Sequence, residues 1–190
     1  MKEKENTKEK ILALGRDLIR DKGYNAFSYQ HISSLLHIKN AAIHYHYPSK
    51  EVLGVDVIHD QTEQFLSMAK DLHTKGANEW AQLEAFFDIY RGNVQDNCKV
   101  CIVGSLGPDY YTIPEKMQEE LRLFIQTVLN WLTSLLAQGR EKRVFHFKAE
   151  PRTKALSIIT NLAAGLYFAR VSSKDDFYAL VQNIKDELQP

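Results

Sequence analysis

Apolar side chains recur along most of the chain at intervals of three and four residues, the spacing that places them on one face of a helix. Proline occurs only at positions 48, 108, 114, 151 and 190, at the ends of these apolar patterns and not inside them. No stretch combines strict apolar–polar alternation with the β-branched residues of a strand. The pattern predicts an all-α protein of about nine helices.

Capping residues and turn signals set the expected helix ends. Thr7, Ser28 and Ser49 are of the types that begin helices, and Gly23 and Gly139 of the type that ends them. The nine predicted helices cover residues 7–21, 28–36, 40–47, 49–73, 78–96, 100–106, 114–138, 151–171 and 175–188.

The second and third predicted helices are short and only three residues apart. Two short helices joined by a turn and braced by a third form a helix-turn-helix, whose second helix fits the major groove of DNA. The second helix is expected to bury Ile32, Leu35 and Leu36, and Tyr47 is expected to pack in the core. Periodicity alone is also consistent with short helices that only pack together and contact no DNA.

Charge is unevenly distributed, although the formal net charge is zero. Residues 1–50 contain nine basic and five acidic residues, whereas residues 51–190 contain 15 and 19. Four of the seven histidines also lie in the first 50 residues. A basic N-terminal segment followed by an acidic remainder favours a polyanionic partner at the N-terminal end.

The composition, with 44% hydrophobic and 25% charged residues, is that of an ordinary soluble globular protein. No run of about 18 apolar residues occurs, so we expect no contact with a membrane interior. Residues 1–10 alternate lysine and glutamate and do not resemble a secretory signal. Two cysteines cannot cross-link a chain of this size, which favours the reducing cytoplasm.

Motifs for metal, redox or catalytic chemistry are incomplete. Cys98 and Cys101 form a Cys-x-x-Cys pair, but a thioredoxin-like site needs a preceding strand and a zinc site needs two more ligands. Asp56 and His59 have the spacing of a di-iron ligand pair, which occurs only once. We therefore expect no enzyme, no cofactor and no metal site. Cys98, beside Lys99, leaves a thiol-based redox sensor using Cys98 and Cys101 as an alternative function.

The segment of residues 7–53 resembles the N-terminal domain of TetR-family transcriptional regulators. The matching features are Thr7 and Ile11-Leu12 in the first helix, Gly23-Tyr24 after it, Ser28 and Ile32 in the second helix, and the run IHYHYPSKEVL from Ile43 to Leu53. Three residues differ from the family pattern. Gly15 replaces alanine in the first helix, His37 replaces the glycine of the turn, and His44 replaces the tyrosine that opens the aromatic run.

The resemblance implies a DNA-binding domain at about residues 5–65, with its motif at about 28–47, and a C-terminal effector-binding and dimerisation domain at 66–190. It implies a ligand-responsive repressor that binds a near-palindromic double-stranded DNA operator as a homodimer and is released by a small-molecule effector. A helical interaction module without DNA affinity is the other alternative.

Positions in the motif assign the expected DNA contacts. The first turn of a recognition helix lies closest to the base edges, so Asn40 is expected to pair with adenine and Lys39 with guanine. Backbone N–H groups at the start of the second helix, and the side chains of Tyr45, His46 and Lys50, suit phosphate groups. The candidate DNA-binding residues are Ser28, Tyr29, Gln30, Lys39, Asn40, Ala41, Ala42, His44, Tyr45, His46 and Lys50.

The last two predicted helices carry broad apolar stripes. These stripes suit either a four-helix interface between two chains or the chain's own core. The small residues from Ala163 to Gly165 would allow two helices to approach closely at such an interface. The candidate dimer residues are Leu156, Ile159, Ala163, Tyr167, Phe177, Leu180, Val181, Ile184 and Leu188.

The resemblance implies an effector pocket, which would lie among the fourth to eighth predicted helices. Aromatic side chains line ligand pockets, although they also fill cores. The candidate lining residues are Phe65, Phe86, Tyr90, Tyr110, Tyr111, Phe124, Trp131 and Phe168.

Overall fold

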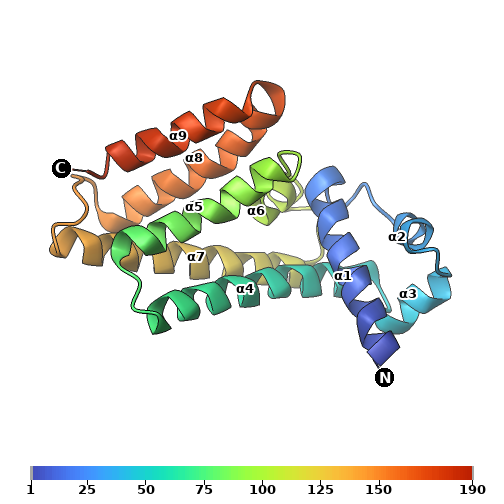
Figure 1. Ribbon diagram of the computed structural model, residues 1–190. Coiled ribbons are helices and arrows are strands. Elements are labelled where there is room, and N and C mark those ends of the chain that lie inside the picture. The colour runs from blue at the N-terminus through green and yellow to red at the C-terminus, as the bar shows by residue number, and fades with distance from the viewer. Residues whose placement is uncertain (1, 190) are drawn as a thin grey trace. The chain divides into compact units, whose positions relative to one another are not determined.

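The computed structural model describes the chain over residues 2–189 and the side chains of residues 6–189. Over this range the protein is all-α, as the sequence predicts, with nine helices and no strand (Figure 1). The helices are α1 (Lys2–Lys22), α2 (Tyr29–Leu36), α3 (Asn40–His46), α4 (Lys50–Thr74), α5 (Glu79–Gln95), α6 (Ile102–Leu106), α7 (Glu115–Glu141), α8 (Pro151–Val171) and α9 (Lys174–Asp186).

Two helix ends differ clearly from the prediction. α1 already begins at Lys2, ahead of the expected cap at Thr7, because the lysines and glutamates before Thr7 are themselves good helix formers. α7 continues through Gly139 to Glu141, although Gly139 was expected to end it.

Gly139 serves close packing. A Cβ atom at this position would lie 2.1 Å from Cδ2 of Phe145. The N–H groups of Val144 and Phe145 both donate to the Gly139 carbonyl, at 2.8 and 3.0 Å. The Phe145 ring is 1% exposed and meets Trp80 edge-on, with centroids 4.9 Å apart. The missing side chain therefore allows the turn after α7 to fold back onto the helix.

The helices group into two compact units. Unit 1 contains the chain up to residue 63 together with residues 102–124, and unit 2 contains residues 64–101 together with the chain from residue 125. α4 and α7 each begin in unit 1 and end in unit 2. Unit 1 thus includes α6 and the start of α7 in addition to most of the expected DNA-binding segment. The functional boundary near residue 65 stays a prediction.

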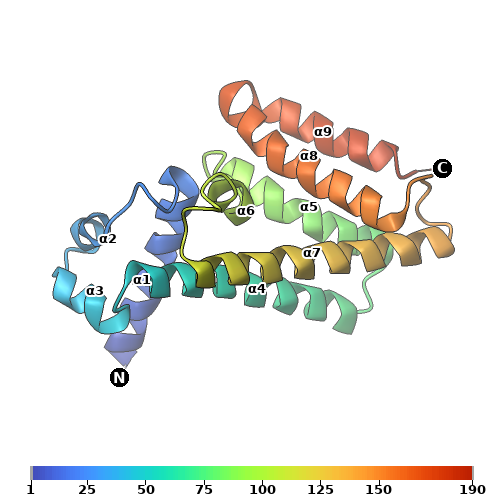
Figure 2. The same ribbon diagram turned by 180° about the vertical axis from the view of Figure 1, so that it is seen from behind.

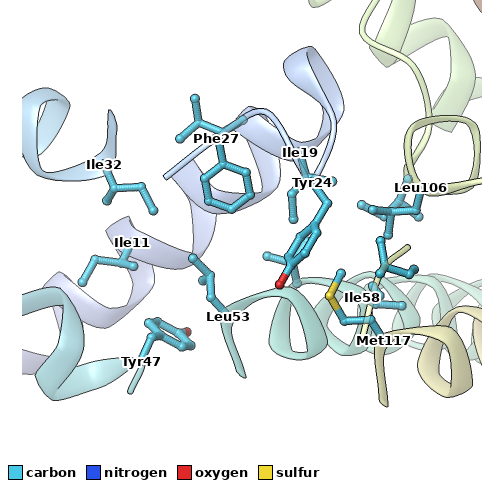
Figure 3. Close-up of a cluster of buried hydrophobic side chains, with 14 of the residues drawn as sticks. Ile11, Ile19, Tyr24, Phe27, Ile32, Tyr47, Leu53, Ile58, Leu106 and Met117 are labelled. Carbon is cyan, nitrogen blue, oxygen red and sulfur yellow. The ribbon is translucent and has the colours of Figure 1, made fainter. Parts of the chain in front are cut away.

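Unit 1 is built around one buried cluster, to which α1, α2, α3, α4, α6 and α7 all contribute (Figure 3). Ile19 and Leu106 are fully buried, and the Tyr24 ring lies beside Met117. α1 packs against α2, α3 and α6. The Ser105 hydroxyl of α6 also donates to the Ile19 carbonyl of α1, which fixes these two helices at their ends.

Unit 2 contains the antiparallel pair α8 and α9, which packs against α5 (Figure 2). Phe177, Val181 and Ile184 are the buried face of α9. Glu84 of α5 pairs with Lys185 of α9 and accepts a hydrogen bond from Arg91 at 2.9 Å. Apolar burial, supplemented by these charged contacts, holds the three helices together.

Replacing Gly139 with alanine should destabilise the protein by about 1–3 kcal/mol, because the new methyl group overlaps the Phe145 ring. The matched control is Gly92→Ala in α5, where a Cβ meets nothing within 4 Å. That change should instead stabilise the protein by about 0.5–1 kcal/mol through helix propensity. Urea unfolding measures both effects, and equal effects of the two changes would contradict the packing role of Gly139.

Candidate nucleic-acid interface

The N-terminus of α2 is fixed by local hydrogen bonds. The Ser28 N–H donates to Nδ1 of His31 at 3.0 Å, and the His31 N–H donates to the Ser28 carbonyl at 3.0 Å. Ser28 and Gln30 are exposed, whereas Ile32 is fully buried. The start of α2 is therefore held in place by packing on one side and lies at the surface on the other.

The turn between α2 and α3 depends on a left-handed residue. His37 has φ 55° and ψ 40°, a conformation that glycine adopts without strain and histidine adopts at some cost. The Ile38 N–H donates to the Ser33 carbonyl at 3.1 Å, which closes the end of α2. Lys39 is extended, and its carbonyl accepts the Ala42 N–H at 2.9 Å as α3 begins.

The first turn of α3 presents its side chains to solvent. Lys39, Asn40 and Ala41 are all exposed, whereas Ile43 on the opposite face is fully buried. Tyr45 is 68% exposed and meets His46 edge-on, with centroids 5.0 Å apart. The candidate base-reading residues thus occupy one accessible turn. Their contacts with DNA stay a prediction.

Two tyrosines of the motif lie inside unit 1. Tyr47 is fully buried, as the sequence predicts. Tyr29 is 8% exposed, and its hydroxyl donates to the Tyr47 carbonyl at 2.9 Å. Burial raises the pKa of Tyr29 to about 12, so the phenol keeps its proton and can donate at neutral pH. The side chain of Tyr29 is therefore structural, which leaves its backbone N–H as the group for a phosphate contact.

His44 joins the end of α3 to the start of α4. Its ring nitrogen Nδ1 lies 3.2 Å from the Pro48 carbonyl, and a proton on Nδ1 makes this a hydrogen bond. The ring also meets the Tyr29 ring edge-on at 4.9 Å between centroids. His44 therefore has a partner within the chain, and its contact with DNA stays a prediction.

The burial predicted for Leu35 is wrong, since its side chain is 57% exposed. The buried face of α2 is centred between Tyr29, Ile32 and Leu36, and at 100° per residue Leu35 lies well to one side of that centre. Spacing from Ile32 alone could not distinguish Leu35 from Leu36. Leu35 is an exposed apolar group on the helix before the turn.

The ammonium group of Lys50 is used inside unit 1. It donates to the Phe27 carbonyl at 2.6 Å and lies 4.4 Å from the ring centroid of Tyr24 and 4.5 Å from that of Phe27. Burial lowers the pKa of Lys50. These contacts tie the start of α4 to the segment between α1 and α2. The predicted phosphate contact of Lys50 stays a prediction beside this internal role.

Most of the expected dimer residues on α9 and just after it pack inside the chain. Phe177, Val181, Ile184 and Leu188 are at most 2% exposed. A Cβ at Gly165 would lie 2.7 Å from Cδ2 of Leu180, so the close approach at α8 is made by the chain's own α9. For these residues the structure shows an internal core.

Other expected dimer residues do reach the surface. Leu156 is 51% exposed and Tyr167 is 41% exposed, while Ile159 and Ala163 are half-buried. Two residues that were not among the expected dimer residues are more exposed than any of these. Phe168, expected to line the effector pocket, is 70% exposed, and Val171 is 87% exposed.

Four of the expected pocket residues form an aromatic cluster in unit 2. Trp131 meets Phe65 edge-on at 5.4 Å and Phe86 at 5.9 Å between centroids, and Phe86 meets Tyr90 at 5.5 Å. Phe65, Phe86 and Tyr90 are buried, and Trp131 is half-buried. We call these four residues the aromatic quartet.

The remaining pocket candidates lie elsewhere. Tyr110, Tyr111 and Phe124 belong to unit 1, and Tyr111 is 92% exposed. Phe168 borders a hollow of about 310 Å³ on α8 and α9, together with Gly165 and Leu180. The effector pocket itself stays a prediction.

The residues considered for redox or metal chemistry have other partners. Cys98 is 4% exposed, and its Sγ lies 3.7 Å from the Val94 carbonyl. Asp56 pairs with Lys8 at 3.3 Å, and His59 lies 3.9 Å from Glu120. Among the described residues, no group of three or more histidine, cysteine, aspartate or glutamate side chains is placed to hold a metal ion.

Replacing Lys50 with methionine should destabilise the protein by about 1–2 kcal/mol, because it removes a charged hydrogen bond and two cation–π contacts. Lys39→Met is the control and should change stability by less than about 0.5 kcal/mol, since Lys39 is exposed. Urea unfolding measures both. If the Lys50 variant is as stable as the parent but its DNA binding depends less on salt, the phosphate contact is the role of Lys50.

Comparisons with known proteins agree with this architecture. Residues 11–55 match the sequence profile of the bacterial regulatory proteins of the tetR family. Comparison with curated proteins finds no match. Within the part of the chain that the structure describes, no helix is long and apolar enough to cross a membrane.

Solved structures resemble the whole chain. A TetR transcriptional regulator from Legionella pneumophila is 30% identical, with a TM-score of 0.85 over 96% of this chain and 97% of that one. A TetR-family regulator from Agrobacterium tumefaciens is 24% identical, with a TM-score of 0.90 over 98% and 100% of the two chains. The reduced form of NemR from E. coli shares the fold at 18% identity, with a TM-score of 0.78 over 96% and 97%. The chain belongs to the TetR family of bacterial transcriptional regulators.

Proposed function

We propose that this protein is a ligand-responsive transcriptional repressor that binds a near-palindromic operator as a homodimer and is released by a small-molecule effector. The observation that carries the proposal is the exposed first turn of α3, held rigidly by the core of unit 1. A regulator of this kind acts in the cytoplasm, where the bacterial chromosome lies.

Lys39 and Asn40 are the proposed base-reading residues. Both are exposed at the point where a recognition helix comes closest to base edges. Asn40 can pair with adenine through its amide, and Lys39 can donate to guanine. Ser28 and Gln30 at the start of α2 would position the domain on phosphate groups and carry no sequence information.

A second copy of the chain is the proposed partner of α8 and α9. Leu156, Tyr167, Phe168, Val171 and Tyr178 are all large apolar or aromatic residues that are at least 38% exposed. Such concentrations of exposed apolar surface mark interaction sites. A two-fold dimer built on this face would present two α3 helices, as binding to two half-sites of a palindrome requires.

The aromatic quartet of unit 2 is the proposed effector site. An apolar or aromatic ligand there would replace part of the contact between the rings of Trp131 and Phe86 with its own contacts to them. α4 and α7 have residues in both units, which supports the proposal that a shift of either helix in unit 2 would be transmitted along it to unit 1. Release of DNA follows only if the effector binds the DNA-free conformation more tightly than the DNA-bound one.

Selection of random duplex DNA with the purified protein should enrich an inverted repeat. Against that sequence, Asn40→Ala should relax preference at particular base positions by about 1–3 kcal/mol. Gln30→Ala is the contrast, because loss of a phosphate-side group should weaken binding to all sequences alike. Competition binding with single-base operator variants distinguishes the two patterns.

Two results would count against DNA recognition by α3. Uniform weakening by Asn40→Ala would remove its base-reading role. Failure to enrich any sequence, with weak binding even at low salt, would favour the helical interaction module.

Replacing Val171 with aspartate should shift the protein from dimer to monomer, because it places a charge in the proposed apolar interface. Tyr111→Asp is the matched control, since Tyr111 is equally accessible but lies in unit 1. Sedimentation velocity over a range of concentrations measures the assembly state. A monomeric parent, or a Val171 variant that remains a dimer, would contradict the proposed interface.

A further inference from the structure

Unit 2 carries a hollow of about 590 Å³ beside the end of α7 and the start of α8. This volume lies within the range of small-molecule sites. No member of the aromatic quartet borders it. Its lining residues are Arg140, Arg143, Phe145, His146, Phe147, Lys148, Ala149, Lys154 and Glu187.

The walls of the hollow are fixed by hydrogen bonds of the segment that connects α7 to α8. Arg143 adopts a left-handed conformation with φ 60°, and its N–H donates to the Arg140 carbonyl at 3.0 Å. The His146 N–H donates to the Leu188 carbonyl at 2.8 Å, which attaches the segment to the C-terminal end of unit 2. The buried Phe145 ring anchors the same segment on α7. The hollow is therefore formed before any ligand arrives.

Positive charge is concentrated around this hollow. Residues 139–154 contain six basic and two acidic residues, whereas the rest of unit 2 contains seven basic and nine acidic residues. Among the lining residues, Lys154 is neutralised by Glu187, since their charged atoms lie 2.6 Å apart. Arg140, Arg143 and Lys148 remain as the excess of positive charge. The hollow is thus a cationic depression on unit 2.

An apolar surface lies beside these charges. The guanidinium carbon of Arg140 is 5.1 Å from the ring centroid of Phe147, and Nη1 of Arg140 donates to the Ala149 carbonyl at 3.0 Å. The arginine is therefore held against the ring with its charge in a defined place. Phe147 is half-buried and Ala149 is exposed, so both offer apolar contacts to a ligand.

We propose that this hollow binds a small aromatic anion, with its acidic group beside Arg140, Arg143 and Lys148 and its ring against Phe147. The cationic side chains select for charge, and the ring and Ala149 select for an apolar part. The site is separate from the effector position proposed above, and binding here does not depend on whether the protein recognises DNA.

Titration of the full chain with phenyl phosphate tests the proposal. Trp80 packs against Phe145, which lines the hollow, so its fluorescence should report occupancy. A Trp131→Phe variant leaves Trp80 as the single tryptophan, because the chain contains two. Calorimetry on the unchanged protein provides a second measurement that does not depend on that variant. We expect saturable binding with a Kd below about 1 mM.

The double change Arg143→Gln and Lys148→Gln should weaken phenyl phosphate binding at least about tenfold, since two of the three cationic side chains proposed to face the anion are removed. The control is Lys116→Gln with Lys174→Gln, which removes the same charge at exposed positions that do not line the hollow. Inorganic phosphate and phenol should each bind more weakly than phenyl phosphate. The proposal is overturned if no saturable binding occurs, if phenol binds as tightly, or if both double variants behave alike.

Discussion

An isolated seven-residue helix is too short to be stable in water, and this constraint governs the whole N-terminal part of the protein. α3 exists because Ile43 and the adjoining Tyr47 are fully buried in unit 1. Burial of these two side chains fixes which face of α3 is left for solvent, and Lys39 and Asn40 lie on that face. The exposed face of α3 is thus a consequence of packing, and its geometry depends on the core that holds it.

Several groups that resemble DNA contacts also serve this core. Lys50 donates to the Phe27 carbonyl, His44 faces the Pro48 carbonyl, and the Tyr29 hydroxyl donates to the Tyr47 carbonyl. Each joins segments that are separated along the chain or lie around a tight turn. A basic or aromatic side chain in such a motif can therefore stabilise the exposed face of α3 from inside unit 1, and substitutions at these positions test that internal role as well as the proposed DNA contact.

In unit 2, likewise, apolar side chains of one helix pair lie both in the core and at the surface. One face of α9 is buried against α8 and α5 of the same chain, while Phe168 and Val171 of α8 are exposed to solvent. An internal core and an external apolar face can share one helix pair because the two faces of a helix are independent. At the other end of α8, the turn folded onto Gly139 gathers arginine and lysine side chains around Phe147. Unit 2 thereby acquires a cationic depression.

The sequence by itself determined the all-α class, nearly all helix limits to within two residues, the helix-turn-helix and the burial of Tyr47, because periodicity, capping and turn chemistry are local properties. It could not decide between Leu35 and Leu36, or show that Gly139 lies within a helix, because these outcomes depend on what packs against each residue. Whether the apolar stripe of α9 packs in the core or against a second chain could not be decided for the same reason. An apolar row specifies that a face is buried, whereas only the tertiary structure decides whether the chain's own helices or another molecule covers it.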